Sequence, residues 1–309
     1  MPSPSKAALS MSLGDWLLLL VLSVLWGGSF YFTKIAVMEI PPMTLALYRV
    51  AIAAATLAVL ARVIGHSFPR DAATWRNLVL MAAFNNVISF TLIFWGQIHV
   101  TVGLAGILNG TTPLFGVLAA HLMTHDERLS IGRIVGLIAG FAGVVLLIGP
   151  ELLTDLGTHV LAELACLAGA FSFGLGAVLA RRVRGYPSIV VATGQLSMST
   201  LLLLPLVLLF DRPTAPFSAS HAAIWSMLAL ALVSSALAYL IYFRLIARAG
   251  ATNALIVTFL SPVSALMLGI LLLDETVDVH QVAGMAAIFI GIAAIDGRPA
   301  RFIGRMLRN

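Results

Sequence analysis

The side chains of this sequence that could do chemistry are the few charged and amide groups inside long apolar runs. Arg49 is the deepest charge, seven residues after Pro42 and roughly 10 Å along a helix. Its guanidinium could hold a substrate carboxylate, or it could bond backbone carbonyls at the end of a neighbouring helix or extend to the surface. Lys34 and Glu163 lie near the ends of their runs, so a place at the mouth of a site, or a pair between them, is expected.

Groups for catalysis or metal binding are sparse. No Asp or Glu lies near the middle of an apolar run, so the sequence offers no buried carboxylate that could relay protons, and any proton chemistry is expected at a boundary group. His121 and His125 are four residues apart but lack the glutamate that metalloproteases place between such histidines. The single cysteine, Cys166, excludes a disulfide and a paired-cysteine metal site. The sequence therefore predicts no catalytic residue, no metal and no cofactor.

Composition places these residues in a membrane protein. Of 309 residues, 60% are hydrophobic and 10% are charged, whereas a soluble domain carries about 25% charged residues. The charges lie in short breaks between apolar runs of roughly 20 residues, each long enough to cross about 30 Å of hydrocarbon as a helix. We predict an all-α integral membrane protein with ten transmembrane helices at 15–37, 43–64, 74–95, 101–122, 130–149, 160–180, 188–209, 222–243, 251–273 and 279–296.

The distribution of charge orients these helices. Most of the 18 lysines and arginines lie in alternate breaks, and acidic residues gather in the others. Because cytoplasmic loops are rich in Lys and Arg, both termini are predicted to be cytoplasmic, in a bacterial inner (plasma) membrane. The net charge of +5 is then a topology signal and does not indicate a nucleic-acid partner.

The chain also repeats itself. "TPLFGVLAAHLMTHDERLSI" at 112–131 is echoed by "LSPVSALMLGILLLDETVDV" at 260–279, and the Asp-Glu pairs at 126–127 and 274–275 are 148 residues apart. We predict two five-helix units, 1–150 and 151–309, the second with a short basic cytoplasmic tail. Because five is odd, the second unit crosses the membrane in the opposite sense. Inverted repeats are common in alternating-access transporters, with a substrate site near the midplane where the halves meet.

Polar and aromatic residues that share helix faces are the candidates for a central cavity. Ordinary interhelical packing and hydrogen bonding is the alternative for each of them, although the asparagines are costly in lipid and must find polar partners. The predicted substrate-binding residues are Trp26, Phe30, Asn86, Ser89, Phe90, Asn109, Phe171, Ser235 and Tyr239.

Prolines and glycines suggest how the helices bend and pack. Pro113 and Pro262 interrupt helices beside hydroxyl residues, which predicts either paired hinges or simple packing kinks. Glycines at 136, 140, 143, 284 and 291 allow close helix packing, either within the protomer or between two copies. Both a monomer and a homodimer agree with the sequence.

Several stretches resemble the EamA type of the drug/metabolite transporter superfamily, and within it amino-acid exporters of the YddG kind. They are "LLLLVLSVLWGGSFYFTKIAV", "LALYRVAIAAATLAVL", "NGTTPLFGVLAAHLMTHDERLSIGRIVGLIAGFAGVVLL" and "LSPVSALMLGILLLDETVDVHQVAGMAAIFIGIAAI". The resemblance implies a ten-helix fold around a central cavity, a small-molecule substrate and export of amino acids. In one departure, Phe-Ser-Phe-Gly at 171–174 stands where the family usually has a tryptophan.

Three classes of function remain at this stage. The first is a transporter of small organic solutes, with amino acids favoured by the resemblance and other metabolites or drugs such as nucleobase-like compounds as the alternative. Without a carboxylate in the middle of a span, facilitated or exchange transport, or weak proton coupling through a boundary group, is expected. The second is an intramembrane enzyme, which would need clustered carboxylates such as Asp274, Glu275 and Asp278 near the headgroups. The third is a channel, which would show a recurrent polar stripe or a filter segment. The inverted duplication favours the transporter.

Overall fold

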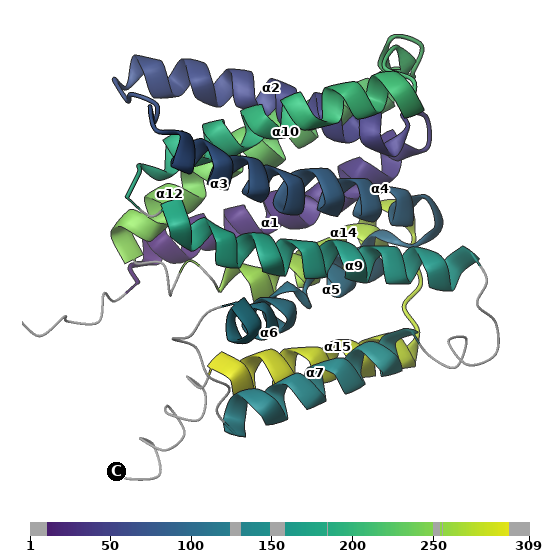
Figure 1. Ribbon diagram of the computed structural model, residues 1–309. Helices are drawn as coiled ribbons and strands as arrows, with labels where there is room; N and C mark the ends of the chain where they lie inside the picture. Colours follow the sequence, from purple (N-terminus) through teal and green to yellow (C-terminus); the bar gives the residue numbers. More distant parts are fainter. Residues whose placement is uncertain are drawn as a thin grey trace, which may run out of the picture.

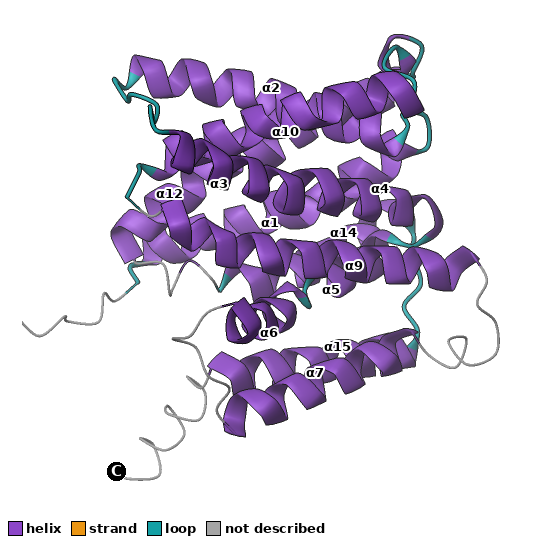
Figure 2. Cartoon of the chain, viewed as in Figure 1, coloured by secondary structure: helices purple, strands orange, loops and turns teal. Residues whose placement is uncertain are grey.

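The computed structural model describes residues 11–123, 131–148, 158–183, 185–249, 254 and 256–296, and every regular element in these ranges is helical (Figures 1 and 2). Seven helices are long and apolar enough to cross a membrane, and three shorter apolar helices complete the set. The all-α membrane fold predicted from the sequence is confirmed. Predictions that concern Asp126, Glu127, His125, the junction near residue 150 and the basic tail fall outside the described residues.

The first unit contains α1 to α7. Its third and fourth spans are each made of two helices. The elements are α1 (Leu13–Val37), α2 (Pro42–Val63), α3 (Ala72–Ala82), the π-helical segment η1 (Ala83–Ile88), α4 (Ser89–His99), α5 (Val102–Asn109), α6 (Thr112–Met123) and α7 (Ile131–Ile148).

The second unit repeats this order from α9 onward. Its third span, like that of the first unit, contains a π-helical segment. The elements are α9 (Thr158–Leu179), the short 3-10 helix η2 (Ala180–Val183), α10 (Ser188–Phe210), the 3-10 turn η3 (Ala215–Phe217), α11 (His221–Ala231), the π-helical segment η4 (Leu232–Leu237), α12 (Ala238–Ala249), α14 (Val257–Leu273) and α15 (Val279–Asp296).

Polar contacts show that the two units run in opposite directions. We call the end of the bundle that holds residues 38–41, 100–101, 211–220 and 274–278 the acidic end, and the opposite end the basic end. Helix α1 begins at the basic end, where Asp15 pairs with Arg248 at 3.0 Å. Helix α9 begins at the acidic end, where the ring of His159 lies 3.2 Å from the carbonyl of His99. The inverted repeat is therefore present in three dimensions.

The π-helical segments η1 and η4 are an additional mark of the repeat, because both contain six residues and they are 149 positions apart. A π turn widens the helix and frees backbone groups that an α-helix would pair. In η1 the carbonyl of Phe84 accepts hydrogen bonds from Ser89 (2.6 Å) and from Ser172 on α9 (2.7 Å). In η4 the hydroxyl of Ser235 similarly reaches back five residues to the carbonyl of Leu230, at 2.9 Å.

Helices α7 and α15 pack against each other as a separate pair, at the bottom of the view in Figure 1. A Cβ atom on Gly143 would lie 2.7 Å from the backbone nitrogen of Ile288, and one on Gly291 would lie 2.6 Å from the carbonyl oxygen of Gly136. Glycine is required at both positions because the two backbones touch. Of the two uses expected for these glycines, the structure shows packing within one protomer.

At the acidic end, three carboxylates cap helix N termini of the opposite unit. Asp211 accepts the backbone N–H of Thr44 at the start of α2 (3.0 Å). Glu275 accepts two N–H groups at the start of α5. Glu39 accepts both the N–H and the hydroxyl of Ser220, the N-cap of α11, at 2.6 Å each. These first-turn N–H groups have no partner inside their own helix, and the helix dipole favours negative charge there.

The Glu39 contact predicts a pH-dependent stability. The Ser220 hydroxyl and then its N–H hold the pKa of Glu39 below its ordinary value. A carboxyl with a lowered folded pKa contributes stability above its unfolded pKa and loses it as pH falls through the folded pKa. The excess unfolding temperature of the wild type over Glu39→Gln should therefore shrink between neutral pH and about pH 3. Thermal unfolding in detergent measures it, and a constant difference over that range would contradict the assignment.

Candidate functional site

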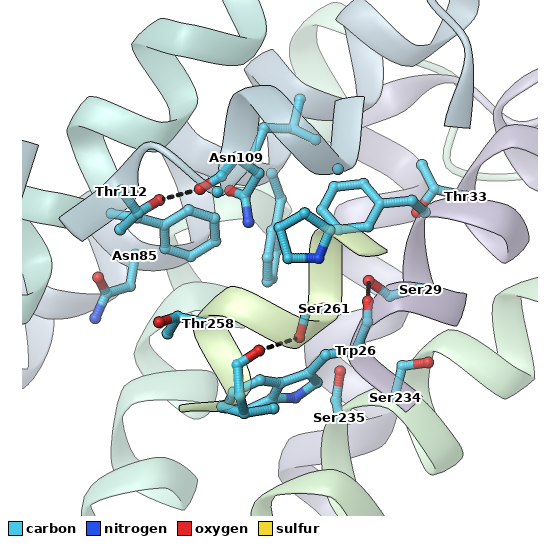
Figure 3. A pocket seen from close by; sticks show the side chains of 18 of the residues that line it. Trp26, Ser29, Thr33, Asn85, Asn109, Thr112, Ser234, Ser235, Thr258 and Ser261 are labelled. Atoms are coloured by element: carbon cyan, nitrogen blue, oxygen red, sulfur yellow. Dashed lines mark hydrogen bonds between the residues drawn. The ribbon is translucent and has the colours of Figure 1, made fainter. Parts of the chain in front are cut away.

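A cavity of about 340 Å³ lies between the two units (Figure 3). Every described span contributes to its wall except α7 and α15. The first unit supplies Trp26, Ser29, Phe30, Thr33, Arg49, Asn85, Phe90, Ile93, Phe94, Gln97, Gly106, Asn109, Gly110, Thr112 and Pro113; the second supplies Phe173, Ala177, Leu196, Ser234, Ser235, Tyr239, Tyr242, Val257, Thr258, Ser261 and Pro262. The central cavity expected for an inverted repeat is present.

Most of the residues predicted from the sequence for the substrate site line this cavity. They come from six different spans, which the fold brings together around one space. Those that do so are Trp26, Phe30, Phe90, Asn109, Ser235 and Tyr239, with Arg49, Pro113 and Pro262.

Asn86, Ser89 and Phe171 lie outside the cavity wall, which corrects their predicted placement. Asn86 is buried and donates to the hydroxyl of Ser199 on α10 at 2.7 Å. Ser89 bonds the carbonyls of Phe84 and Gly169. Phe171 is 41% exposed on the outer face of α9, with its ring edge-on to Phe115.

The displacement of Asn86 has a specific cause. The prediction counted back from Gln97 with the 3.6-residue period of an α-helix. The π segment η1 inserts one extra residue into that count, so that Asn85 faces the cavity in place of Asn86. On α9 the side that faces the cavity begins two residues after the predicted Phe171. Phe173 and Ala177, which are spaced i, i+4, line the cavity.

The offset of 149 residues between the two units identifies further cavity residues that were not predicted from helix faces. Residues 149 positions after Asn109, Thr112 and Pro113 are Thr258, Ser261 and Pro262, and all six line the cavity. The site is thus built from matching positions of the two units. Figure 3 shows Thr258 and Ser261 on one side of the space and Asn109 and Thr112 on the other.

Arg49 is buried in the wall of the cavity, with 8% of its surface exposed. Its Nε donates to the hydroxyl of Ser235 at 3.0 Å, and its guanidinium carbon lies 4.3 Å above the centre of the Phe90 ring. Cation–π contact over an aromatic face partly compensates the lost hydration. Within the described part of the chain, no hydrogen bond joins Arg49 to a backbone carbonyl and no carboxylate lies within ion-pair distance.

Three buried oxygens in the cavity wall have no hydrogen-bond partner among the residues that the structure describes: Gln97 Oε1, Asn109 Oδ1 and Ser234 Oγ. The amide nitrogen of Gln97 is already committed to the carbonyl of Phe30 at 2.9 Å. A buried polar atom without a partner costs about 1–3 kcal/mol. These atoms therefore need water or a ligand that donates hydrogen bonds.

Lys34 lies outside this cavity, at the acidic end. Its Nζ donates to the carbonyls of Gln97 (2.9 Å) and Val100 (2.9 Å), which end α4. The boundary position expected from the sequence is thus explained by capping of a helix C terminus, where a positive charge is favourable. Among the described residues, no group of three His, Cys, Asp or Glu side chains could hold a metal ion.

Two inverted units around a central cavity with polar and aromatic walls define a membrane transporter. The model of the EamA-like transporter family matches residues 14–149 and 160–295, so the chain belongs to this family, with one copy in each unit. Its members are transporters and not enzymes.

Relatives agree with this assignment over nearly the full length. The chain is 23% identical over 272 residues to "Uncharacterized transporter YoaV" of Bacillus subtilis, covering 87% of this chain and 92% of that protein. It is 26% identical over 294 residues to a "Probable terminal-alkyne amino-acid exporter" of Streptantibioticus cattleyicolor, covering 94% and 95%. A solved structure described as "Crystal structure of protein" shares the fold, with a TM-score of 0.65, 21% identity and coverage of 97% and 100%.

Proposed function

We propose that this transporter exports amino acids by alternating access between its two units, which meet near residue 150. In this proposal the basic end and both termini face the cytoplasm of a bacterium, and the acidic end faces outward. The observation that carries the substrate class is the charge pattern of the cavity. A guanidinium that pairs with no described carboxylate lines the same cavity as buried oxygens that have no donor among the described residues.

A zwitterion provides a negative group for the guanidinium and a positive donor group for the buried oxygens. The carboxylate of an amino acid would bind the guanidinium of Arg49, whose flat donor fork matches a carboxylate. Its ammonium group would donate to the amide oxygens of Asn109 and Gln97. The name of the Streptantibioticus relative supports the same substrate class.

The rest of the wall suits an uncharged side chain. The rings of Trp26 and Tyr242 are in tilted contact at 5.3 Å between their centres, and those of Phe90 and Phe94 stack at 5.5 Å. Such rings bind apolar groups by area and by ring stacking. A nucleobase-like compound is the second candidate, because it would use the same rings and amides, but it would leave Arg49 without a counter-charge.

Counterflow in liposomes tests the proposed function. Purified protein is reconstituted, loaded with an unlabelled amino acid, and offered labelled amino acids or purines from outside. Saturable exchange of at least one neutral amino acid is expected, and Phe171→Ala, which alters a side chain outside the cavity, should retain it. Exchange of purines alone, or no saturable exchange by folded protein, would overturn the assignment to amino acids.

Within this scheme Pro113 and Pro262 are paired hinges, one in each unit. Both line the cavity, and α5 ends at Asn109, just before Pro113. Alanine at both positions should leave amino-acid binding within about twofold but slow exchange by roughly tenfold, since it restores a backbone bond at 262, inside α14, and releases the fixed φ at 113, the second residue of α6. Binding by calorimetry and exchange in liposomes separate the two effects. If the exchange rate is unchanged, the prolines are packing kinks and not hinges.

A further inference from the structure

The carboxylate of Glu275 joins the two units at the acidic end. Glu275 follows α14 of the second unit, and its two oxygens accept the N–H groups of Val102 (2.6 Å) and Gly103 (3.0 Å) in the first turn of α5. Helix α5 belongs to the first unit. This carboxylate therefore binds an unsatisfied helix N terminus across the boundary between the units.

Lys34 holds the other side of the same loop. Its ammonium group donates to the carbonyls of Gln97 and Val100 at the end of α4, as described above, and also to that of Ile98 at 3.3 Å. The loop between α4 and α5 is thus held by a cation at the helix end before it and by an anion at the helix start after it. Each charge has the sign that the helix dipole favours.

The backbone around Glu275 is shaped for this contact. Asp274 adopts a left-handed conformation (φ 51°), which ends α14, and the N–H of Glu275 then bonds the carbonyl of Gly269 at 3.2 Å. A Cβ atom on Gly269 would overlap the carboxylate of Glu275. Glycine at 269 leaves the space through which the carboxylate reaches α5.

These contacts lie directly beyond the cavity. Thr33, Gln97 and Gly106 are cavity residues, and each lies within one helical turn of a contact residue on its own element. Toward the acidic end, the cavity wall therefore continues into the loop that Glu275 and Lys34 hold. Separation of the start of α5 from the end of α14 would therefore open the cavity wall at this end.

We propose that Glu275 and Lys34 form a clamp that closes the cavity at the acidic end, and that the bonds from Glu275 to α5 must break for the cavity to open there. The clamp rests on the proposed alternating access, but not on the identity of the substrate. Lys34 keeps the loop between α4 and α5 in the position that receives the carboxylate.

Distance measurements on the full chain in lipid nanodiscs test the clamp. Spin labels are attached to cysteines at Trp95, on α4, and at Thr276, beside Glu275, with Cys166 replaced by alanine. In the parent protein one short distance should dominate. Glu275→Ala removes bonds between a charged group and two N–H donors, so the longer-distance population should rise roughly tenfold or more.

Further variants make the test specific. Gly269→Ala, which displaces the carboxylate, should reproduce the effect of Glu275→Ala, and Glu275→Gln should give a smaller shift because one acceptor oxygen remains. Asp278→Asn removes one negative charge from the same end without touching α5, and it should leave the distances unchanged. If Glu275→Ala does not fold, Gly269→Ala and Glu275→Gln carry the comparison.

Unchanged distances in the folded Glu275 and Gly269 variants would overturn the clamp, as would an equal shift with Asp278→Asn. No substrate is needed for this readout. An absence of amino-acid exchange would therefore count against the proposed function alone, and unchanged distances would count against the clamp alone.

Discussion

Replacing Arg49 with methionine should reduce amino-acid exchange about a hundredfold, because a bond to a charged group contributes about 1.5–3 kcal/mol and each 1.4 kcal/mol is a factor of ten. The guanidinium is the only charged group in the cavity wall within the described residues. Its Nε is held by Ser235 and its flat face rests on Phe90, so the remaining donors are available to a substrate carboxylate. Initial exchange rates in liposomes with equal amounts of protein measure the loss.

Stability measurements separate this role from a structural one. A buried charge without a charged partner is costly to keep out of water, so its replacement by an apolar side chain of similar size should be neutral or stabilising. Arg49→Met should therefore unfold at an equal or higher temperature while it loses exchange. Arg49→Lys keeps the charge but loses the fork, so its exchange should be intermediate. A parallel loss of stability and exchange in Arg49→Met would indicate that the arginine serves the fold, and normal exchange would exclude it from the site.

Valine in place of Gly27 should destabilise the protein by about 3 kcal/mol or more, and alanine there by about 1–3 kcal/mol, as overpacking does in tightly packed cores. Helix α1 crosses α14 at this glycine. A Cβ atom would lie 2.6 Å from the Cβ of Ser264 and 2.8 Å from the backbone nitrogen of Ala265. Relief requires the two helices to move apart, which would also break the 2.6 Å hydrogen bond between Ser23 and Ser264.

The adjacent glycine provides a matched control. A Cβ atom on Gly28 would meet its nearest neighbour, the side chain of Leu268, at 3.6 Å, which is an ordinary contact. Because alanine also favours a helix over glycine, Gly28→Ala should be neutral or slightly stabilising. Thermal unfolding in detergent compares the variants. Equal destabilisation by alanine at 27 and at 28 would mean that glycine matters here only through helix propensity.

The sequence by itself determined the class of fold. The apolar runs, the alternation of basic and acidic breaks, and the paired Asp-Glu motifs predicted ten spans in two inverted units. Each of these signals follows from transfer of side chains into lipid, which acts on every residue separately and so is readable locally. Cavity residues on regular helices, such as Trp26, Tyr239 and Asn109, could be found for the same reason.

Tertiary structure decided which asparagine faces the cavity. Helical periodicity selected Asn86, but the π segment η1 turns Asn85 inward, and the Phe84 carbonyl that the π turn frees is satisfied by Ser172 from α9. A contact 88 residues away along the chain thus stabilises the local departure. In the same way, the sequence shows Glu275 only as one of several acidic residues in the break between two spans, and the packing of α14 against α5 gives it two helix N–H groups to bind. Such pairings depend on which helices become neighbours, and the pattern within any one helix does not contain that information.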